Sequence, residues 1–253
     1  MNTIADLWRY SEACSHVNPS QYPEFSGYIF TPMKNIDDFG YIAEGPDRII
    51  ISFRGTKGTI RAWIENFMVW PLAGDGFFQS GPWGEGTIHK GFYDAWVWFK
   101  DPITQYIKNL LKTNPKPNIY CTGHSRGGAL STLCARHIAK NLGIPCSCIG
   151  FGSPMVGNSE FRDQYNKLPI YHTRCEMEFD IVPTVPPTSF GFRSVGIPLI
   201  FKKPYLLPFT GRWYKSHYYS TYTKGVIAYL PPTDIEDVES IKAMKIVLSR
   251  CSI

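Results

Sequence analysis

Residues 118–130, with the sequence NIYCTGHSRGGAL, decide the fold of this chain. The first five of them, NIYCT, predict a short strand, and a Gly-x-Ser-x-Gly motif at residues 123–127 follows directly. Residues 126–141 then predict a helix, which ends before Gly143. A strand that turns sharply into a helix at such a motif lifts the serine side chain above the edge of a sheet.

Strands and helices alternate on both sides of this stretch. Residues 48–53 read RIIISF, a β-branched run typical of a strand that is covered on both faces. Apolar residues at helical spacing predict a helix over 93–111, which Pro102 is expected to kink or divide. Further strands are predicted at 27–31, 40–44, 145–151 and 170–175. The order of these elements predicts an α/β fold with a parallel sheet and right-handed crossovers.

The ends of the chain and its proline-rich part complete the expected layout. Residues 1–17 and 235–248 predict helices, whereas the proline-rich residues 183–215 predict irregular connections. No linker divides the sequence. We therefore expect residues 1–253 to form a single domain, which is long enough to bury a large core.

Composition and charge exclude several classes of protein. With 43% hydrophobic and 19% charged residues, the chain is too apolar to be disordered. Its net charge of +5 includes no Lys/Arg cluster, so we expect no nucleic-acid partner. No apolar run approaches the roughly 18 residues of a membrane span, so no transmembrane segment is expected. Residues 1–20 lack the apolar core of a signal peptide, which predicts an intracellular, cytoplasmic location unless a leader has been removed.

The seven cysteines are odd in number and irregularly spaced, which disfavours a disulfide framework. Cys146 and Cys148 have no second cysteine pair or histidine cluster in the sequence to complete a metal site, and none is expected. Most of the cysteines are therefore interpreted as small buried hydrophobic residues.

Ser125 is the candidate nucleophile, at the centre of the motif GHSRG. The turn is too tight for a Cβ at the glycine positions, and the following helix brings backbone N–H groups near a developing oxyanion. The alternative is a plain glycine-rich turn in which Ser125 caps the helix. The strand–turn–helix context favours the nucleophile.

His217 is the candidate base. A serine hydroxyl needs a neighbouring base, and on this type of fold the chain order is serine, acid, histidine. Of the three histidines after Ser125, His137 lies in the helix that follows the motif and His172 lies inside a predicted strand. His217, within the sequence KSHYY, is therefore favoured. The alternative is an ordinary histidine of a surface loop.

The acid is expected between Ser125 and His217, at the end of a strand, where it would fix the tautomer of the histidine. The candidates are Glu160, Asp163, Glu176, Glu178 and Asp180, and the predicted strand at 170–175 leads to the last three. Asp180 precedes the apolar, rigid sequence Ile-Val-Pro, which suits a partly buried carboxylate. An ordinary turn-forming aspartate is the alternative. From the residues alone, Asp180 and Glu178 remain close.

Six short segments occur in one order along most of residues 25–220. They are 53–56 (FRGT), 60–64 (IRAWI), 89–92 (HKGF), 123–130 (GHSRGGAL), 152–158 (GSPMVGN) and 180–187 (DIVPTVPP). Together they resemble the fungal-type class 3 lipases, a branch of the α/β-hydrolases. The resemblance implies a mostly parallel central sheet flanked by helices, with a short helical lid.

The same resemblance implies roles for residues at the site. It selects Asp180 over Glu178 as the triad acid, and it matches His217 to the family's late histidine. It also implies an oxyanion hole made by the backbone N–H of Arg126 and by the N–H and hydroxyl of Thr56. The family usually has leucine where this chain has Arg126. That guanidinium could favour an anionic substrate or be held away by a salt bridge.

Residues 57–70 (KGTIRAWIENFMVW) correspond to the lid that the resemblance implies. Their apolar residues recur at the i, i+3, i+4 and i+7 positions of an amphipathic helix, and these are Ile60, Trp63, Ile64 and Phe67. In a closed state this face would cover the acyl groove, and in an open state it would meet lipid. The alternative is a surface helix that stays packed on the core.

The expected function is hydrolysis of the carboxylic esters of acyl lipids, in the manner of a triacylglycerol lipase and without a cofactor. The alternatives among enzymes are a phospholipase A1, a galactolipid hydrolase and an esterase of phenolic esters. A lipase-like scaffold that binds partners without turnover is the alternative outside enzymes. The expected partners are the acyl-lipid substrate and, through the lid, a lipid interface, while the oligomeric state stays open.

Overall fold

The computed structural model describes residues 3–14, 25–56, 78–80, 86–202 and 215–229. The helices are α1 (Thr3–Ala13), α3 (Lys90–Leu110), α4 (Arg126–Asn141), α5 (Ser159–Tyr165) and α7 (Tyr219–Tyr229), with the short 3-10 helices η5 (Val182–Thr184) and η6 (Thr188–Phe190). The strands are β1 (Ile29–Lys34), β2 (Phe39–Glu44), β3 (Ile49–Phe53), β4 (Phe78–Ser80), β5 (Thr87–His89), β6 (Ile119–His124), β7 (Cys146–Phe151), β8 (Gly157–Asn158), β9 (Ile170–Met177), β10 (Phe192–Arg193) and β11 (Ile197–Phe201).

A seven-stranded sheet in the order β1-β2-β3-β6-β7-β9-β11 forms the centre of the fold. The last five of these strands run parallel, and β1 and β2 pair antiparallel on one side, so the predicted mostly parallel sheet is confirmed. The register places Phe53 of β3 opposite Gly123 of β6, and His124 opposite Phe151 of β7. These strands therefore end together, at what we call the carboxyl edge of the sheet.

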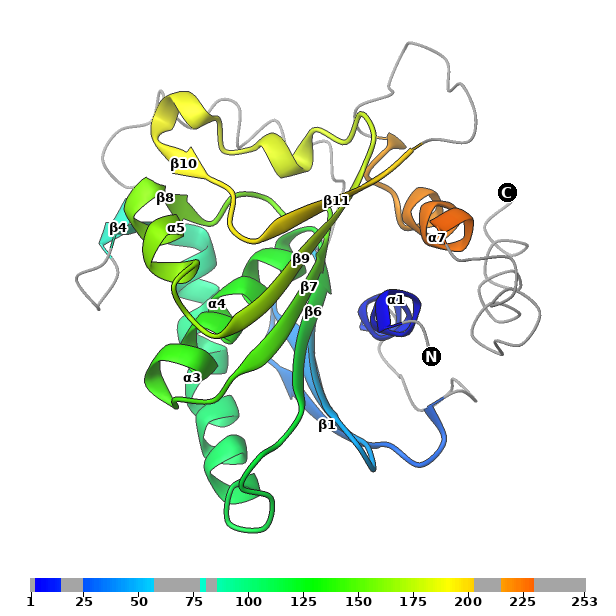
Figure 1. The fold of residues 1–253 in the computed structure, drawn as a ribbon, viewed down its shortest axis with the longest axis vertical. Helices are drawn as coiled ribbons and strands as arrows, with labels where there is room; N and C mark the ends of the chain where they lie inside the picture. Colours follow the sequence, from blue (N-terminus) through cyan, green and yellow to red (C-terminus); the bar gives the residue numbers. More distant parts are fainter. Residues whose placement is uncertain (1–2, 15–24, 57–77, 81–85, 203–214, 230–253) are drawn as a thin grey trace.

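Helices cover both faces of the sheet (Figure 1). Helices α3 and α4 lie on one face, and α1 and α7 lie on the other. Trp96 and Leu130 belong to the core of the first face, whereas Trp8, Phe151 and Tyr222 belong to that of the second. Burial on both faces explains why four of the five residues of β3 are apolar and why all five are buried. Thirteen of the 16 residues of α4 are buried, which holds its first turn firmly at the carboxyl edge.

A smaller antiparallel sheet has the strand order β10-β8-β5-β4, and its strands lie in the sequence between strands of the main sheet.

The six cysteines in the described part of the chain are buried with free thiols, which confirms their interpretation as buried residues. No helix within the described ranges is long and apolar enough to cross a membrane.

Some elements differ from those that the sequence predicts. Pro102 does not divide its helix, because α3 runs without a break through the proline. The proline-rich part contains β11, which pairs with β9 and includes Pro198, a residue that a strand at the edge of a sheet tolerates. Helix α7 is not predicted, since its aromatic and β-branched residues have weak helix propensity. The predicted helix at 235–248 lies outside the described residues.

Candidate active site

Ser125 lies at the carboxyl edge, between the last residue of β6 and the first residue of α4. Its backbone has φ 58° and ψ −129°, a conformation that residues with a side chain rarely adopt. Strain of this kind is concentrated at functional positions. The Ser125 side chain makes no capping hydrogen bond to α4, which contradicts the alternative of a simple helix cap. The turn thus has the geometry of a nucleophile elbow.

The end of β3 packs directly on the first turn of α4. A Cβ at Gly127 would lie 2.1 Å from the carbonyl oxygen of Phe53, so this approach requires glycine. The contact brings the segment after β3 beside the elbow, because a Cβ at Gly55 would lie 3.6 Å from the Cβ of Ser125. Thr56 comes next, and its hydroxyl is buried without a hydrogen-bond partner among the described residues. Its position fits the predicted role in an oxyanion hole.

His217 and Asp180 form a buried pair. The His217 Nδ1 lies 2.7 Å from the Asp180 Oδ2, and neither side chain has exposed surface. The other carboxylate oxygen, Oδ1, accepts the N–H of Val182 at 2.9 Å. When Nδ1 donates to the carboxylate, Nε2 of the neutral imidazole is an acceptor, and this Nε2 has no partner among the residues described. Asp180, rather than Glu178, is therefore the carboxylate that contacts His217, and it leaves the second ring nitrogen of His217 as an acceptor.

Tyr222 of α7 is a third member of this cluster that the sequence does not reveal. Its hydroxyl donates to the Asp180 Oδ2 at 2.7 Å and accepts the N–H of Met177 at 3.1 Å. Burial, followed by the nearby Asp180 carboxylate, raises the pKa of Tyr222 well above its usual value, so the hydroxyl keeps its proton. No motif marks this tyrosine, but a correct prediction of α7 would have placed it one helical turn after the segment of His217.

His124 links the pair to the serine. It precedes Ser125, and its ring stacks on that of His217 with centroids 4.5 Å apart and planes inclined by 29°. Burial lowers the pKa of His124 well below its usual value, and the neighbouring His217 lowers it further, so His124 is neutral. Ser125 and His217 are not hydrogen bonded to each other in this structure. In unliganded sites such bonds are often long and tighten when the substrate binds.

The other two histidines that follow Ser125 in the sequence make contacts away from the candidate site. His172 Nδ1 lies 2.8 Å from the hydroxyl oxygen of Tyr165, and His137 Nε2 lies 2.8 Å from the Thr104 Oγ1. Their contacts agree with the sequence-based choice of His217 as the base.

The guanidinium of Arg126 is bound by Asp38, in the loop between β1 and β2. The Arg126 Nη1 lies 2.6 Å from the Asp38 Oδ1, and the two side chains are 20% and 10% exposed. Of the two alternatives for this cation, the salt bridge is the one observed. The backbone N–H of Arg126 belongs to the first turn of α4, where the N–H groups have no partner within the helix.

Comparison with known families agrees with this geometry. Residues 50–190 match the family model described as Lipase (class 3). This chain belongs to the class 3 lipase family. The matched residues of this class 3 lipase include the elbow and Asp180, while His217 lies beyond them.

Two curated relatives illustrate the range of the family. Phospholipase A1-II 3 of Oryza sativa subsp. indica is 30% identical over 203 residues, which cover 66% of this class 3 lipase and 48% of the rice protein. The lipase of Rhizomucor miehei is 33% identical over 153 residues, which cover 58% of this chain and 40% of the fungal protein. The matches therefore span less than half the length of either relative.

A solved triacylglycerol lipase, in which a serine protease triad forms the catalytic centre, has a similar structure. It is 26% identical to this class 3 lipase, with a TM-score of 0.67, and the alignment covers 78% of this chain and 77% of that one. The parallel sheet flanked by helices is thus the predicted α/β-hydrolase fold.

The predicted lid at 57–70 lies outside the described residues of this class 3 lipase, and so do its four apolar positions, Ile60, Trp63, Ile64 and Phe67.

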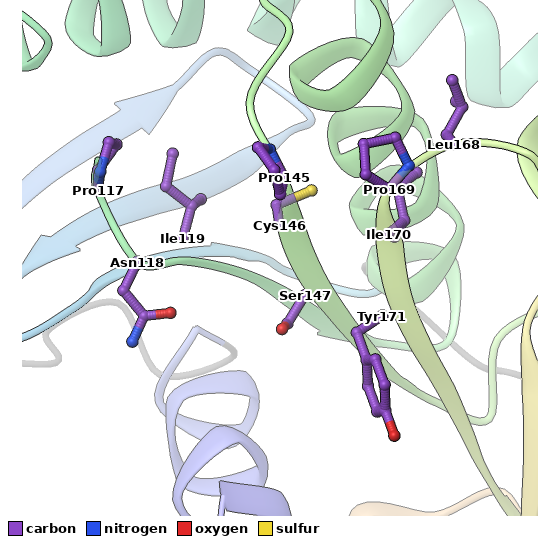
Figure 2. A pocket seen from close by; sticks show the side chains of 10 residues that line it. All are labelled: Pro117, Asn118, Ile119, Pro145, Cys146, Ser147, Leu168, Pro169, Ile170 and Tyr171. Carbon is purple, nitrogen blue, oxygen red and sulfur yellow. The ribbon is translucent and has the colours of Figure 1, made fainter. Parts of the chain in front are cut away.

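A hollow of about 450 Å³ is formed where β6, β7 and β9 begin (Figure 2). It is lined by residues 117–119, 145–147 and 168–171. Ser125 lies at the opposite, carboxyl edge of the sheet, so this hollow is not part of the candidate active site.

Proposed function

We propose that this class 3 lipase hydrolyses the carboxylic esters of acyl lipids, with Ser125 as nucleophile, His217 as base and Asp180 as the orienting acid. The observation that carries the proposal is the buried His217–Asp180 pair, whose second imidazole nitrogen lacks a partner among the described residues. The strained elbow and the stacking of His124 on His217 support a place for the serine beside that nitrogen. The triad of the related triacylglycerol lipase also supports it.

Acylation begins when the Ser125 Oγ attacks the ester carbonyl carbon and His217 Nε2 takes the hydroxyl proton. Asp180 stabilises the imidazolium and keeps its Nδ1–H oriented. The N–H of Arg126, together with the N–H and hydroxyl of Thr56, binds the oxyanion of the tetrahedral intermediate. The bond to the alcohol oxygen then breaks, and the imidazolium returns its proton to that oxygen. The product of this half-reaction is a free alcohol and an acyl-Ser125.

Deacylation repeats the same steps with water. His217 Nε2 removes a proton as the water oxygen attacks the acyl carbon, and the oxyanion hole again holds the negative oxygen. Collapse of this second intermediate breaks the bond to Ser125 Oγ, which takes the proton from the imidazolium. The fatty acid leaves, and the side chains of the enzyme return to their starting protonation states.

Neutral acylglycerols are the substrates that we favour. Asp38 already neutralises the guanidinium beside the nucleophile, so Arg126 offers no unpaired charge to a phosphate group. Phospholipase A1 activity is the second candidate, because the rice relative carries that name and is 30% identical to this chain.

The proposal extends to the lid and the domain. Residues 57–70 close over the acyl groove and contact lipid when they open. Residues 1–253 act as one domain, so limited proteolysis is expected to yield no pair of stable halves.

Replacement of the nucleophile tests the activity. Ser125→Ala should abolish hydrolysis of p-nitrophenyl butyrate and labelling by a fluorophosphonate, while circular dichroism shows an unchanged fold. Turnover near that of the wild type would exclude Ser125 as nucleophile. A panel of tributyrin, triolein, phosphatidylcholine and phosphatidylglycerol then ranks the substrates. Faster cleavage of the phospholipids than of the two triacylglycerols would favour the second candidate.

A further inference from the structure

The loop between β1 and β2 is held in shape by its own polar contacts. The side-chain oxygen of Asn35 accepts the N–H groups of Asp37 at 2.8 Å and Asp38 at 2.6 Å. The N–H of Asn35 in turn donates to the carbonyl oxygen of Asp38 at 3.0 Å. Such Asx-turn bonds restrict the backbone, so Asp38 is presented from a defined position. We refer to residues 35–38 as the Asn35 loop.

The Asn35 loop is bonded to both segments that carry the proposed oxyanion donors. On one side, Asp38 binds the guanidinium of Arg126 at 2.6 Å. On the other side, the Nη2 of Arg54 donates to the carbonyl oxygen of Asp37 at 3.2 Å, and its backbone N–H donates to the first residue of β2 at 2.9 Å. Arg54 stands two residues before Thr56 in the sequence. One loop therefore connects the two halves of the proposed oxyanion hole.

The charge of Arg126 needs compensation at this position. As the first residue of α4, it holds a cation against the partial positive charge of the helix N-terminus. Asp38 supplies the opposite charge, and both side chains are largely shielded from solvent, which weakens screening by salt. Near Arg126, His89 is neutral, because burial, with a smaller effect of Arg126, lowers its pKa to about 4.

We propose that Asp38 and Arg126 are a positioning pair whose salt bridge sets the spacing between the backbone N–H groups of Arg126 and Thr56. This inference rests on the proposed function. The salt bridge acts through the backbone, without contact between either side chain and the substrate. An oxyanion hole binds the transition state more tightly than the bound ester. Loosening the pair should therefore lower kcat and leave KM nearly unchanged.

Two substitutions test the pair. Asp38→Asn keeps the shape of the side chain and removes its charge, while Arg126→Leu introduces the residue that class 3 lipases usually have at this position. Each should lower kcat for p-nitrophenyl butyrate about tenfold, with KM changed less than about twofold. The affinity for a boronic acid, which forms a tetrahedral adduct with the serine, should fall by the same factor as kcat/KM. The double variant should lose about as much as either single variant, because the two residues act as one unit.

A matched control separates this effect from the general loss of a salt bridge. Asp47→Asn removes the pair of Asp47 and Arg48, 2.9 Å apart, at the opposite edge of the same sheet, and it should change neither kcat nor KM. Should Arg126→Leu fail to fold, Arg126→Lys preserves the charge and should keep more than half of the wild-type kcat.

Several results would overturn the inference. The first is an unchanged kcat in Asp38→Asn. The second is a loss of kcat in the double variant that equals the product of the losses in the two single variants. The third is a lower melting temperature in the single variants with no change in kcat or boronate affinity. The wild type distinguishes this failure from failure of the proposed function. If it neither reacts with a fluorophosphonate nor hydrolyses the ester, both ideas fall. If it does both and Asp38→Asn matches it, the positioning role alone is excluded.

Discussion

The hydroxyl of Tyr222 donates a 2.7 Å hydrogen bond to the Asp180 Oδ2, the same oxygen that the His217 Nδ1 contacts. Two donors on one oxygen hold the carboxylate in one orientation and share its negative charge. Tyr222 therefore helps to keep Asp180 aligned with the imidazole of His217. Three ionisable side chains, Asp180, Tyr222 and His124, contact His217, and Glu176 lies close enough to Asp180 and Tyr222 to affect them electrostatically.

Removal of this hydroxyl should slow the enzyme. In Tyr222→Phe, the Asp180 carboxylate loses one of the two donors on its Oδ2, so it holds the imidazole of His217 less firmly in place. We expect kcat/KM at pH 8 to fall about fivefold, the effect of one lost hydrogen bond. Initial rates with p-nitrophenyl butyrate measure this loss.

Tyr41→Phe is the control for that substitution. Tyr41 is also fully buried, and its hydroxyl donates to the carbonyl oxygen of Tyr10 at 2.5 Å, in contact with α1 rather than with the triad. This variant should lose stability and keep the wild-type kcat/KM. If Tyr222→Phe also kept the wild-type kcat/KM, the tyrosine would have a structural role alone.

Gly152, the residue after β7, leaves space for the triad. Its φ is 55°, and a Cβ there would lie 2.8 Å from the Tyr222 hydroxyl, 2.9 Å from the His217 Cε1 and 3.0 Å from the Asp180 Oδ2. Gly152→Ala should therefore push the imidazole out of position. A displacement of about 1 Å is enough for a loss of about 100-fold in kcat/KM, which ester hydrolysis would detect.

Gly143→Ala isolates the steric part of this effect. Gly143, after α4, has a φ of 69°, yet a Cβ there would meet nothing within 4 Å. Strain at positive φ should cost each variant about 1 kcal/mol of stability, and the close contacts of the added Cβ should cost Gly152→Ala more. Only Gly152→Ala should lose activity, and equal activity in the two variants would contradict the proposed packing of the triad.

Buried neutral histidines should make the fold sensitive to acid. Burial is the main cause that lowers the pKa of His89 to about 4 and of His172 to about 3. In the unfolded chain these groups bind protons near pH 6.5. Because the unfolded state then holds more protons, the free energy of unfolding should fall as the pH drops from about 6.5 toward 4. Each histidine contributes about 1.4 kcal/mol per pH unit in this window.

Urea unfolding at pH 7.5, 6.5 and 5.5 measures this dependence. His172→Gln removes one of the titrating groups, so its stability should fall less steeply with acid, by up to about 1.4 kcal/mol per pH unit. Burial raises the pKa of Asp6 and Glu176, which gives an opposite trend, but this contribution is common to both proteins. Parallel pH dependences of the wild type and the variant would refute the assignment of His172 as a buried neutral group.

Local sequence was sufficient where local interactions decide the structure. The predicted bounds of α4 agree with the observed helix, because a stretch without proline lies between the elbow and the glycine that follows the helix. The β-branched run of β3 was likewise recognisable, since burial on both faces leaves a strand in which four of the five residues are apolar. The motif around Ser125 identified the elbow because the turn itself demands its glycines.

Other elements and contacts depend on residues far apart in the sequence, so no local sequence pattern predicts them. Helix α7 is stabilised by packing beside α1, and β11 by its pairing with β9, so weak propensity and a proline did not prevent either from forming. The salt bridge between Asp38 and Arg126 joins residues 88 positions apart in the sequence. The hydrogen bond between Tyr222 and Asp180 joins residues 42 positions apart.

The amino-acid sequence by itself determined the parallel α/β layout and the position of the elbow serine, because helix periodicity, β-branched runs and turn glycines act over a few neighbouring residues. Only the tertiary structure decided that Tyr222 binds the same carboxylate oxygen of Asp180 as His217 does, and that Asp38 holds the Arg126 guanidinium. Those choices follow from which side chains the sheet register and helix packing bring within hydrogen-bonding distance.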